Sequence, residues 1–508
     1  MTPLIIICIY LALLLGLGLA SHRFFKGTSR DYFVASHSIG PFLLLMSVFG
    51  TTMTAFALVG STGESYRHGI GTYGKMASYS GLIHSACFFV VGIRLWALGK
   101  RHGYLTQCAF FRDRFESPLL GYLLFPILVG LVIPYLLIGI IGAGAVVQSI
   151  TRDPTSELLA SGVPRWLTGL VICGIVLIYI FFGGLRGAAW ANTFQTLVFM
   201  VTGIITVWVI ASKLGGLAAA SEAVLSNAEQ AHKLSREKIP PMGFLTYCFI
   251  PLSVGMFPHL FQHWLTARSA RTFRLTIIAH PLFIMIVWVP CVLIGVWATS
   301  AVFPDSYARA GELIVGPKHP PNAELAIIVK ALTNPALAGL LAAGILAAIM
   351  SSLDSQFLCL GTMFTNDVAL RLFDEKKFSD GQKLFMARAF IVTIVLITYL
   401  LSLAEPRQVF RMGIWCFTGF GSLFPLVIAA LYWRRATKAG AIACVAVTAV
   451  VWFVLFARAD YGSKTLLITP LKMMPATVIF GASLLSLVGV SLVTRRPSNE
   501  TLAKFFRA

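Results

Sequence analysis

About 13 apolar runs follow one another along the 508 residues, and each is long enough to cross a lipid bilayer. One crossing takes about 20 mainly apolar residues. The runs lie near residues 3–21, 40–62, 72–98, 119–147, 166–182, 189–211, 243–265, 275–300, 336–362, 385–403, 411–433, 439–457 and 472–494. Only 12% of the residues are charged, whereas soluble proteins carry about a quarter. The pattern predicts an all-α polytopic membrane protein and excludes a soluble, disordered or disulfide-stapled chain.

Basic residues outnumber acidic ones by 40 to 20, and their placement indicates how the chain crosses the bilayer. Lys and Arg collect in short cytoplasmic loops. With the N-terminus outside, most of them fall on short inside segments, such as the group Arg268, Arg271 and Arg274. An odd number of spans puts the C-terminus in the cytoplasm, so we expect a multi-pass protein of the cell membrane. Because this rule accounts for the net charge of +20, no nucleic-acid partner is expected.

Two of the predicted spans carry helix-breaking sequence at mid-depth. Residues 50–55 read Gly-Thr-Thr-Met-Thr-Ala, and residues 251–259 read Pro-Leu-Ser-Val-Gly-Met-Phe-Pro-His. An interrupted helix is tolerated in a bilayer only where protein or water surrounds it. Corresponding breaks in two halves are typical of the central site of an inverted-repeat transporter. Since Pro and Gly are common in membrane spans, kinked packing helices are the alternative interpretation.

The two broken spans lie five spans apart, so each opens a five-helix unit that inverts on repetition because five is odd. The predicted organisation has five parts. These are an extra helix and inner loop over residues 1–39, a first repeat over 40–211, an outer loop over 212–242, a second repeat over 243–433, and extra helices with a short tail over 434–508.

Asp354 is the only acidic residue deep inside a predicted span. A carboxylate at this depth is costly unless it is paired, so it marks a functional site by default. On a helix, Ser351, Asp354 and Ser355 share one face, with Ser352 beside them. Hard oxygen ligands of this kind suit a small hard cation, and the carbonyls freed by a broken helix add to them. The alternatives are that Asp354 pairs with a nearby cation such as Lys75, or that it is protonated in a structural hydrogen bond.

Several short motifs occur in order along the chain. They are Ser-Arg-Asp-Tyr-Phe at 29–33, Ser-Ile-Gly at 38–40, Gly-Tyr-Leu-Thr at 103–106, Gly-Gly-Leu-Arg at 183–186, Pro-His at 258–259, Ser-Ser at 351–352 and Tyr-Trp-Arg-Arg-Ala-Thr at 432–437. From about residue 28 to 445, the chain thereby resembles the sodium:solute symporter family, which includes proline permeases and sodium–glucose transporters. The resemblance implies a five-plus-five inverted-repeat fold similar to the bacterial leucine transporter, with extra helices at both ends.

The resemblance also implies a sodium site where the two repeats meet. Carried over by position, its ligands are the backbone carbonyls of Gly50, Met53 and Ala348. The hydroxyls of Ser351 and Ser352 complete the set.

Family positions that line the solute pocket correspond here to Thr54, Ala55, Phe56 and Pro258, and His259 adjoins them. These side chains differ from those of proline and sugar carriers, so the solute is not carried over. His259 and His263 share a helical face and resemble half of a metal site, but no third ligand has suitable spacing. We interpret them as lining the cavity or the inner gate.

One position departs from the family. Relatives often carry Asp two residues after the tryptophan of the sixth span, and here that position is Asn192. The membrane carboxylate stands instead at Asp354, where relatives often have a small or hydroxyl residue. Our hypothesis is that Asp354, with Ser355 and Asn192, serves a second cation or proton site.

The resulting functional prediction is a secondary active symporter that imports a small organic solute with sodium. Its partners would be the solute, sodium and the lipid bilayer. No cofactor beyond the coupling ion and no enzymatic activity are expected, and the nine cysteines form no CxxC pair. The alternatives are a proton-coupled carrier of the same fold that uses Asp354, a solute-sensing membrane protein that acts through a partner, and a membrane enzyme.

Overall fold

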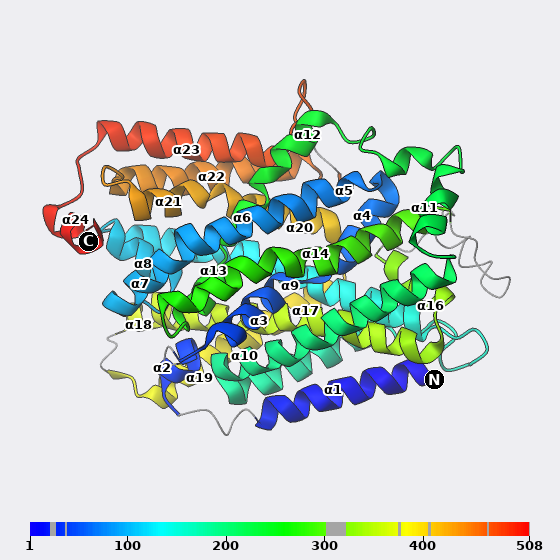
Figure 1. The fold of residues 1–508 in the computed structure, drawn as a ribbon. Helices are drawn as coiled ribbons and strands as arrows, with labels where there is room; N and C mark the ends of the chain where they lie inside the picture. Colours follow the sequence, from blue (N-terminus) through cyan, green and yellow to red (C-terminus); the bar gives the residue numbers. More distant parts are fainter. Residues whose placement is uncertain are drawn as a thin grey trace.

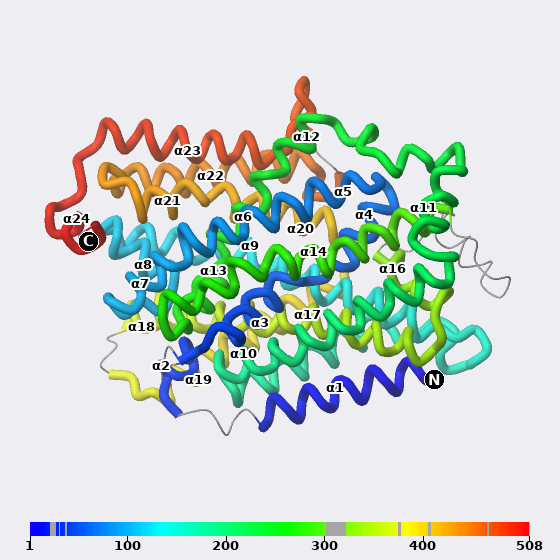
Figure 2. The backbone as a smooth tube through the Cα atoms, viewed as in Figure 1, coloured from blue at the N-terminus to red at the C-terminus, as the bar shows by residue number. Residues whose placement is uncertain are grey.

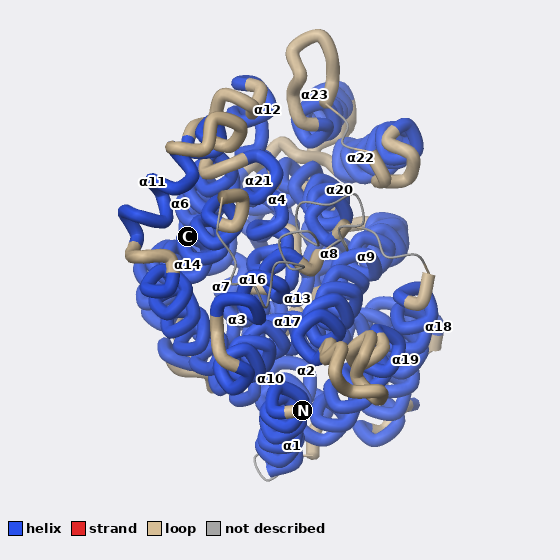
Figure 3. Tube along the Cα trace, turned by 90° about the vertical axis from the view of Figure 1, so that its right-hand side faces the viewer, coloured by secondary structure: helices blue, strands red, loops and turns tan. Residues whose placement is uncertain are grey.

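The computed structural model describes residues 1–20, 27–35, 38–300, 322–373, 377–404, 408–464 and 467–506. Within these ranges the elements are helices, apart from two isolated β-bridges. The helices run roughly along one common direction and form a bundle, with α1 at one edge and α22 and α23 at the opposite edge (Figures 1 and 3). The C-terminal helix α24 returns to the end of the bundle where α8 lies (Figure 2), and there the Phe505 ring is 6.1 Å from the Phe110 ring.

The helices have the following bounds. The part of the chain up to residue 213 contains α1 (Thr2–Ala20), α2 (Ser29–Val34), α3 (Pro41–Thr52), η3 (Phe56–Gly60), α4 (Ser61–His68), α5 (Gly71–Tyr73), η4 (Gly74–Ser78), α6 (Tyr79–Cys87), η5 (Phe88–Gly92), α7 (Ile93–His102), α8 (Gln107–Arg114), α9 (Pro118–Thr151) and α10 (Arg165–Lys213). The later part contains α11 (Leu217–Leu225), η6 (Ala231–Leu234), α12 (Pro241–Thr246), η7 (Tyr247–Phe249), η8 (Pro251–Gly255), α13 (Pro258–Leu265), η9 (Ala270–Thr272), α14 (Phe273–Trp297), α16 (Glu324–Leu332), α17 (Pro335–Met363), η11 (Phe364–Ala369), α18 (Leu370–Leu372), α19 (Asp380–Ser402), α20 (Val409–Ser422), α21 (Phe424–Tyr432), α22 (Lys438–Arg458), α23 (Pro475–Val493) and α24 (Asn499–Phe506).

Ten helices among the described residues are long and apolar enough to cross a membrane, and two bent pairs raise the number to 12. Their positions agree with the predicted apolar runs. The centre is formed by α17 and by α20 with α21, because 83% and 89% of their apolar windows are buried. The helices near the chain ends are peripheral, since only 22% of the window of α1 and 28% of that of α23 are buried.

The 49-residue helix α10 is sharply bent. A straight helix of that length would extend about 73 Å, far more than one bilayer crossing requires. Gly184 has φ 54° and ψ −155°, which a residue with a side chain rarely adopts. Tyr179 before this break and Asn192 after it both reach the Asp354–Ser355 pair on α17. The two legs of α10 therefore turn back on each other, although the total of 13 spans stays a prediction.

The reversal of α10 is fixed by the N-terminal motif on α2. A Cβ at Gly184 would lie 3.0 Å from the Tyr32 Cα atom, so only glycine allows this close approach. Beside it, Arg186 donates to the Asp31 carboxylate at 2.7 Å and to the Ala35 carbonyl at 3.1 Å. The motifs at residues 29–33 and 183–186, which are about 150 residues apart in the chain, thus contact each other and hold the turn of α10.

Both spans predicted to be broken are broken. Between α3 and the η3–α4 segment the axis bends by 58°, and between α12–η8 and α13 it bends by 49°. Met53 leaves the helix with φ −90° and ψ 103°, and Pro258 cannot donate a backbone hydrogen bond into the helix that it begins. These breaks free backbone carbonyls in the interior of the bundle.

Candidate sodium and solute site

The break at the end of α3 touches the middle of α17. The Ser351 hydroxyl lies 2.8 Å from the Gly50 carbonyl oxygen and 2.9 Å from the Ala348 carbonyl oxygen. A hydroxyl has one hydrogen and can therefore satisfy only one of the two carbonyls at a time. Three of the five predicted sodium ligands are thus brought together from positions 301 residues apart.

Glycine allows a close approach where α3 meets its neighbours. A Cβ atom on Gly50 would lie 2.6 Å from the Thr196 hydroxyl of α10 and 3.4 Å from the Ser351 hydroxyl. The first distance is too short for any real contact, so a larger residue would have to displace the Thr196 hydroxyl or α3 itself. The small residue at position 50 therefore determines how close its own carbonyl comes to α17.

The other two predicted ligands are also buried. The Ser352 hydroxyl, which is 2% exposed, accepts a hydrogen bond from the Gln356 amide at 2.6 Å. Met53 is 1% exposed, and its N–H donates back to the Phe49 carbonyl at 3.0 Å. Both residues face protein and not lipid, as an ion site requires. Their role as ligands stays a prediction.

Asp354 is completely buried and is held by neutral hydrogen-bond donors. The Tyr179 hydroxyl donates to Oδ2 at 3.0 Å, and the Ser355 hydroxyl donates to Oδ1 at 2.9 Å. With its amide oriented to satisfy its surroundings, Asn192 donates to Oδ2 at 2.9 Å. Within the described residues no Lys or Arg forms an ion pair with Asp354, and the alternative pairing with Lys75 is wrong because that ammonium binds Glu64 at 2.5 Å.

The residue at the family's acidic position therefore faces the carboxylate that this chain carries elsewhere. Asn192 on the second leg of α10 and Asp354 on α17 form a carboxylate–amide pair across the helix interface. The sequence indicated both residues but not Tyr179, because a tyrosine in an apolar run is common and has no distinctive spacing. His263 also joins the group, since its Nε2 atom lies 2.9 Å from the Ser355 hydroxyl.

Two of the predicted solute residues meet in one aromatic cluster. We define this aromatic cluster as Phe56, Tyr135, Phe257, His259 and Phe417. The Phe417 ring lies 4.9 Å from both the Phe56 and Tyr135 rings, and the His259 ring lies 5.1 Å from Phe257 and 5.7 Å from Tyr135. Both ring nitrogens of His259 are buried without a hydrogen-bond partner among the described residues.

The remaining predicted solute positions frame this cluster. Thr54 and Ala55 are buried in the break, where the Thr54 hydroxyl accepts a hydrogen bond from the Phe56 N–H at 3.0 Å. Pro258 begins α13 directly before His259. Sequence reasoning missed Tyr135 and Phe417, because aromatic residues in spans are usually packing residues and nothing in the pattern shows which helix they face.

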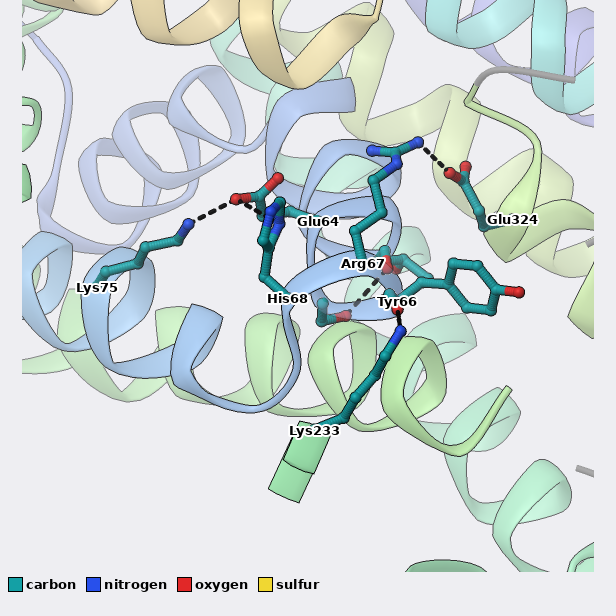
Figure 4. Close-up of polar contacts among 9 residues, drawn as sticks. Glu64, Tyr66, Arg67, His68, Lys75, Lys233 and Glu324 are labelled. Carbon is teal, nitrogen blue, oxygen red and sulfur yellow. Dashed lines mark hydrogen bonds and ion pairs between the residues drawn. The ribbon is translucent and has the colours of Figure 1, made fainter. Parts of the chain in front are cut away.

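A separate charged group lies around α4, at the end of the second predicted span (Figure 4). Glu64 on α4 accepts from the Lys75 ammonium at 2.5 Å and lies 3.2 Å from the His68 ring. Arg67 donates to Glu324 at 2.6 Å. The Lys233 ammonium donates to the Tyr66 carbonyl, and burial together with the nearby Arg67 charge lowers the pKa of this lysine.

A membrane-embedded helical bundle with two broken spans, and with carbonyl and hydroxyl oxygens at the break, defines the class of secondary active transporters. The model of the sodium:solute symporter family matches residues 32–447. The chain therefore belongs to this family, and the predicted resemblance is confirmed.

Curated relatives support the same conclusion over nearly the whole chain. The sodium/proline symporter of Haemophilus influenzae is 26% identical over 520 residues, with 99% of this chain and 97% of that protein covered. The sodium/pantothenate symporter of Escherichia coli is 26% identical over 447 residues, with 84% of each chain covered. The prediction of a sodium-driven symporter for a small organic solute is confirmed. Since the family consists of symporters, it supports a role other than catalysis.

Solved structures confirm the predicted fold class. A Na⁺-coupled sialic acid symporter in a substrate-bound outward-open state has a TM-score of 0.75 at 16% identity, and 98% of this chain and 99% of that chain are covered. A transporter of the nucleobase-cation-symport-1 family in a closed conformation has a TM-score of 0.56 at 14% identity, covering 93% and 97%. The chain has the five-plus-five inverted-repeat architecture of a multi-pass membrane transporter.

Proposed function

We propose that the coupling sodium ion binds where the end of α3 meets α17, with the Gly50 and Ala348 carbonyls and the Ser351 hydroxyl as ligands. The observation that carries this proposal is the convergence of these three oxygens. The Ser351 hydroxyl oxygen lies 2.8 Å from the Gly50 carbonyl oxygen and 2.9 Å from the Ala348 carbonyl oxygen. All three are hard, uncharged oxygens, which suit a small hard cation better than a transition metal. The Met53 carbonyl and the Ser352 hydroxyl complete the proposed set of five.

Sodium at this position would couple ion binding to the shape of the solute site. The ion would take the place of the single hydrogen bond that the Ser351 hydroxyl can donate, and it would bind both carbonyl oxygens at once. The ion would thereby fix residues 53–55 against α17 and stabilise an outward-open state ready for solute. One sodium ion that enters a cell at 100 mV contributes about 2.3 kcal/mol, which supports roughly 50-fold accumulation of the solute.

The proposed solute contacts are Thr54, Ala55, Phe56, Pro258 and His259, beside the other rings of the aromatic cluster. Such a site surrounds the apolar part of a solute with rings and orients its polar part with a few groups. His259 is suited to the second task, because its buried ring nitrogens lack a partner among the described residues. The relatives named above transport proline and pantothenate, and these two solutes are the first to test.

Asp354 is proposed to hold a second sodium ion together with Ser355 and Asn192. The carboxylate is surrounded by three neutral donors and lacks an ion-pair partner among the described residues, so its charge is uncompensated when it is ionised. A cation bound there would supply the missing charge. The structure of the Na⁺-coupled sialic acid symporter, which is similar in fold, reveals a novel Na⁺ site.

Proton coupling is the second candidate function, and it is favoured by the same observation. A buried, ionised carboxylate without a cation partner is also suited to take up a proton, because protonation removes the uncompensated charge. Uptake in sodium-free buffer that is driven by an acid-outside gradient would support this candidate. Uptake that needs sodium at every pH would support the second sodium ion.

The test of the proposed function uses the purified full chain in proteoliposomes. A thermal-shift screen against amino acids, small organic acids and sugars, with and without sodium, identifies the solute, and its uptake is then driven by an inward sodium gradient. We expect sodium to enhance solute binding and a sodium gradient alone to drive accumulation. Solute binding and uptake that do not depend on sodium would contradict the proposal.

We also propose that the N-terminus lies outside and the C-terminus in the cytoplasm, with repeats at residues 40–211 and 243–433. The basic residues of the short loops support this orientation. Reporter fusions at both ends test it, because a reporter that is active only in the cytoplasm should work at the C-terminus alone.

A further inference from the structure

A cavity of about 310 Å³ lies beside the charged group of Figure 4, at the membrane face that also carries the predicted outer loop 212–242. Its walls come from α4, η4, the segment 238–247, α20 and the residues Lys464, Leu467, Met474 and Pro475 between α22 and the start of α23. A volume of this size accommodates a small organic molecule. None of the residues proposed for the sodium or solute site lines it, so it is a separate place.

The cavity is rich in positive charge. The basic side chains that line it are Arg67, His68, Lys75, Lys238, Arg411 and Lys464. The one acidic side chain among its described lining residues is Glu64, which binds Lys75 at 2.5 Å. Glu324 and Asp460, which lie outside the lining, neutralise Arg67 and Lys464.

Two cations remain without a carboxylate. Within the described part of the chain, neither Lys238 nor Arg411 forms an ion pair, and the Arg411 guanidinium donates only to the Ser463 carbonyl. A cleft lined by one sign of charge concentrates oppositely charged solutes. The cavity is therefore electrostatically suited to an anion.

The rest of the lining is apolar and aromatic, from Tyr247, Phe410, Ile414, Trp415, Met474 and Pro475. The Lys75 ammonium lies 5.4 Å from the centre of the Phe410 ring and 5.9 Å from that of Tyr247, which fixes its position above these rings. An inorganic anion would leave this apolar surface unused. A carboxylate attached to an apolar body would use both parts of the cavity.

The floor of the cavity leads toward the proposed solute site. The Phe410 ring stacks on the Phe56 ring at 5.2 Å with an angle of 9° between them, and Phe56 belongs to the aromatic cluster. Phe56 is seated against Gly413, where an added Cβ would overlap its ring. A stacked pair of rings thus separates the cationic cavity from the break in the second span.

We propose that this cavity is the first binding station for the transported solute, and that the solute is a small organic anion, such as a carboxylate with an apolar body. The inference rests on the proposed transport function and adds to it the chemical class of the solute. The Phe56–Phe410 pair then acts as the barrier that the solute passes on its way to the central site.

The first experiment measures the potential of the cavity without any solute. Cysteine is placed at Ile414 in the full chain with Cys8→Ala and Cys248→Ala, because the other cysteines are buried. The reaction rates with an anionic and a cationic methanethiosulfonate are compared in detergent. We expect the anionic reagent to react about fivefold faster, and K238Q or R411Q to lower this ratio severalfold.

K213Q is the matched control, because Lys213 is exposed and does not line the cavity, and it should leave the ratio unchanged. Met474→Cys provides a second position if the Ile414 variant does not fold. A ratio near one at both positions, or a ratio that K238Q and R411Q leave unchanged, would overturn the inference.

The second experiment asks which solutes protect the introduced cysteine. Pantothenate is compared with pantothenol, and propionate with propionamide, because each pair differs at the carboxylate. Protection by a carboxylate but not by its uncharged partner is the expected result. Equal protection by both partners, or protection by neither acid, overturns the inference.

The proposed function fails separately, through the absence of sodium-driven uptake in the proteoliposomes. If the cavity attracts anions but sodium-driven uptake is absent, the transport proposal is contradicted, whereas the positive potential of the cavity is still established. Sodium-driven uptake of only neutral or cationic solutes would remove the inference and leave the transport proposal in place.

Discussion

The buried carboxylates at the centre of the bundle and at its predicted outer end have opposite kinds of partner. At the outer end, Glu64 and Glu324 are neutralised by Lys75 and Arg67, at 2.5 Å and 2.6 Å. At the centre, Asp354 receives hydrogen bonds from hydroxyl and amide groups, and no described Lys or Arg pairs with it. The outer carboxylates already have their counter-charge in the chain. The central one, when it is ionised, has no counter-charge among the described residues, so the proposed sodium ion or a proton would have to supply it.

A comparison within the centre refines this point. The Gly50–Ala348–Ser351 group holds three neutral oxygens, whereas one helical turn further along α17 the Asp354 group holds a formal charge. A sodium ion at the neutral group gains only dipoles and would be bound weakly and released easily. An ion at the charged group gains a full opposite charge and would be bound more tightly. The two groups should therefore respond differently to mutation.

The largest effect is expected from Ser351→Ala, because this change removes the one side-chain oxygen that joins both carbonyls. Sodium-driven uptake should fall about 100-fold, since the ion loses a ligand and the break in the second span loses its contact with α17. Uptake into proteoliposomes at a series of sodium concentrations measures the effect.

Ser483→Ala is the matched control, because Ser483 is a buried serine on the peripheral helix α23. It should leave uptake within about twofold of the unaltered chain. Normal sodium-driven uptake by the Ser351 variant would contradict the neutral site, whatever the result at Asp354.

The next largest effect is expected from Asp354→Asn, which removes the charge and keeps the shape. If Asp354 holds a second sodium ion, the Hill coefficient for sodium should fall toward one, and half-maximal uptake should require about tenfold more sodium. If it carries a proton instead, the sodium dependence should stay unchanged and the pH dependence of uptake should disappear.

The double variant Asn192→Asp with Asp354→Asn tests the pair as a unit. It returns a carboxylate to the position that relatives often use, 2.9 Å from the amide that now replaces Asp354. We expect it to recover most of the sodium dependence that the single variant loses. A double variant as impaired as the single one would show that the position of Asp354, and not the presence of a charge, is what matters.

The comparison also shows what the sequence could predict. The one face shared by Ser351, Asp354 and Ser355 follows from helical spacing, and the break near Gly50 follows from the lack of aliphatic residues there. Both are local properties. The family resemblance supplied the contact between α3 and α17, which local spacing does not contain.

Long-range partners were not predictable in this way. Tyr179 reaches Asp354 across 175 residues, and Arg67 reaches Glu324 across 257. Periodicity shows which face of a helix is polar but not which helix lies opposite. The cationic cavity was not predictable for the same reason. Its lining comes from five separate segments, and in the sequence their charges look like ordinary loop charges.

At the predicted outer end, Glu64→Gln should destabilise the protein without changing its sodium dependence. The change leaves the largely buried Lys75 ammonium without its carboxylate, which costs about 1–3 kcal/mol and should lower the Tm. E64Q combined with K75M should recover most of the loss, because it removes the unpaired charge as well. A changed sodium Hill coefficient in E64Q would contradict the distinction between the two regions.

The smallest effect is expected from Tyr179→Phe, which removes one of the three neutral donors to Asp354 and leaves the ring in place. One hydrogen bond of this kind contributes about 1 kcal/mol, so the sodium concentration for half-maximal uptake should change by about fivefold at most, and the Hill coefficient for sodium, unlike that of Asp354→Asn, should stay unchanged. The direction of the change is informative. The Tyr179 hydroxyl stabilises the carboxylate when no ion is bound, so losing it should make a bound cation more favourable and lower the half-maximal sodium concentration. If the hydroxyl instead orients the carboxylate toward the ion, the concentration should rise. Tyr122→Phe, at an exposed tyrosine of α9, should leave the half-maximal sodium concentration unchanged. If both substitutions have the same effect, Tyr179 does not act through the Asp354 site.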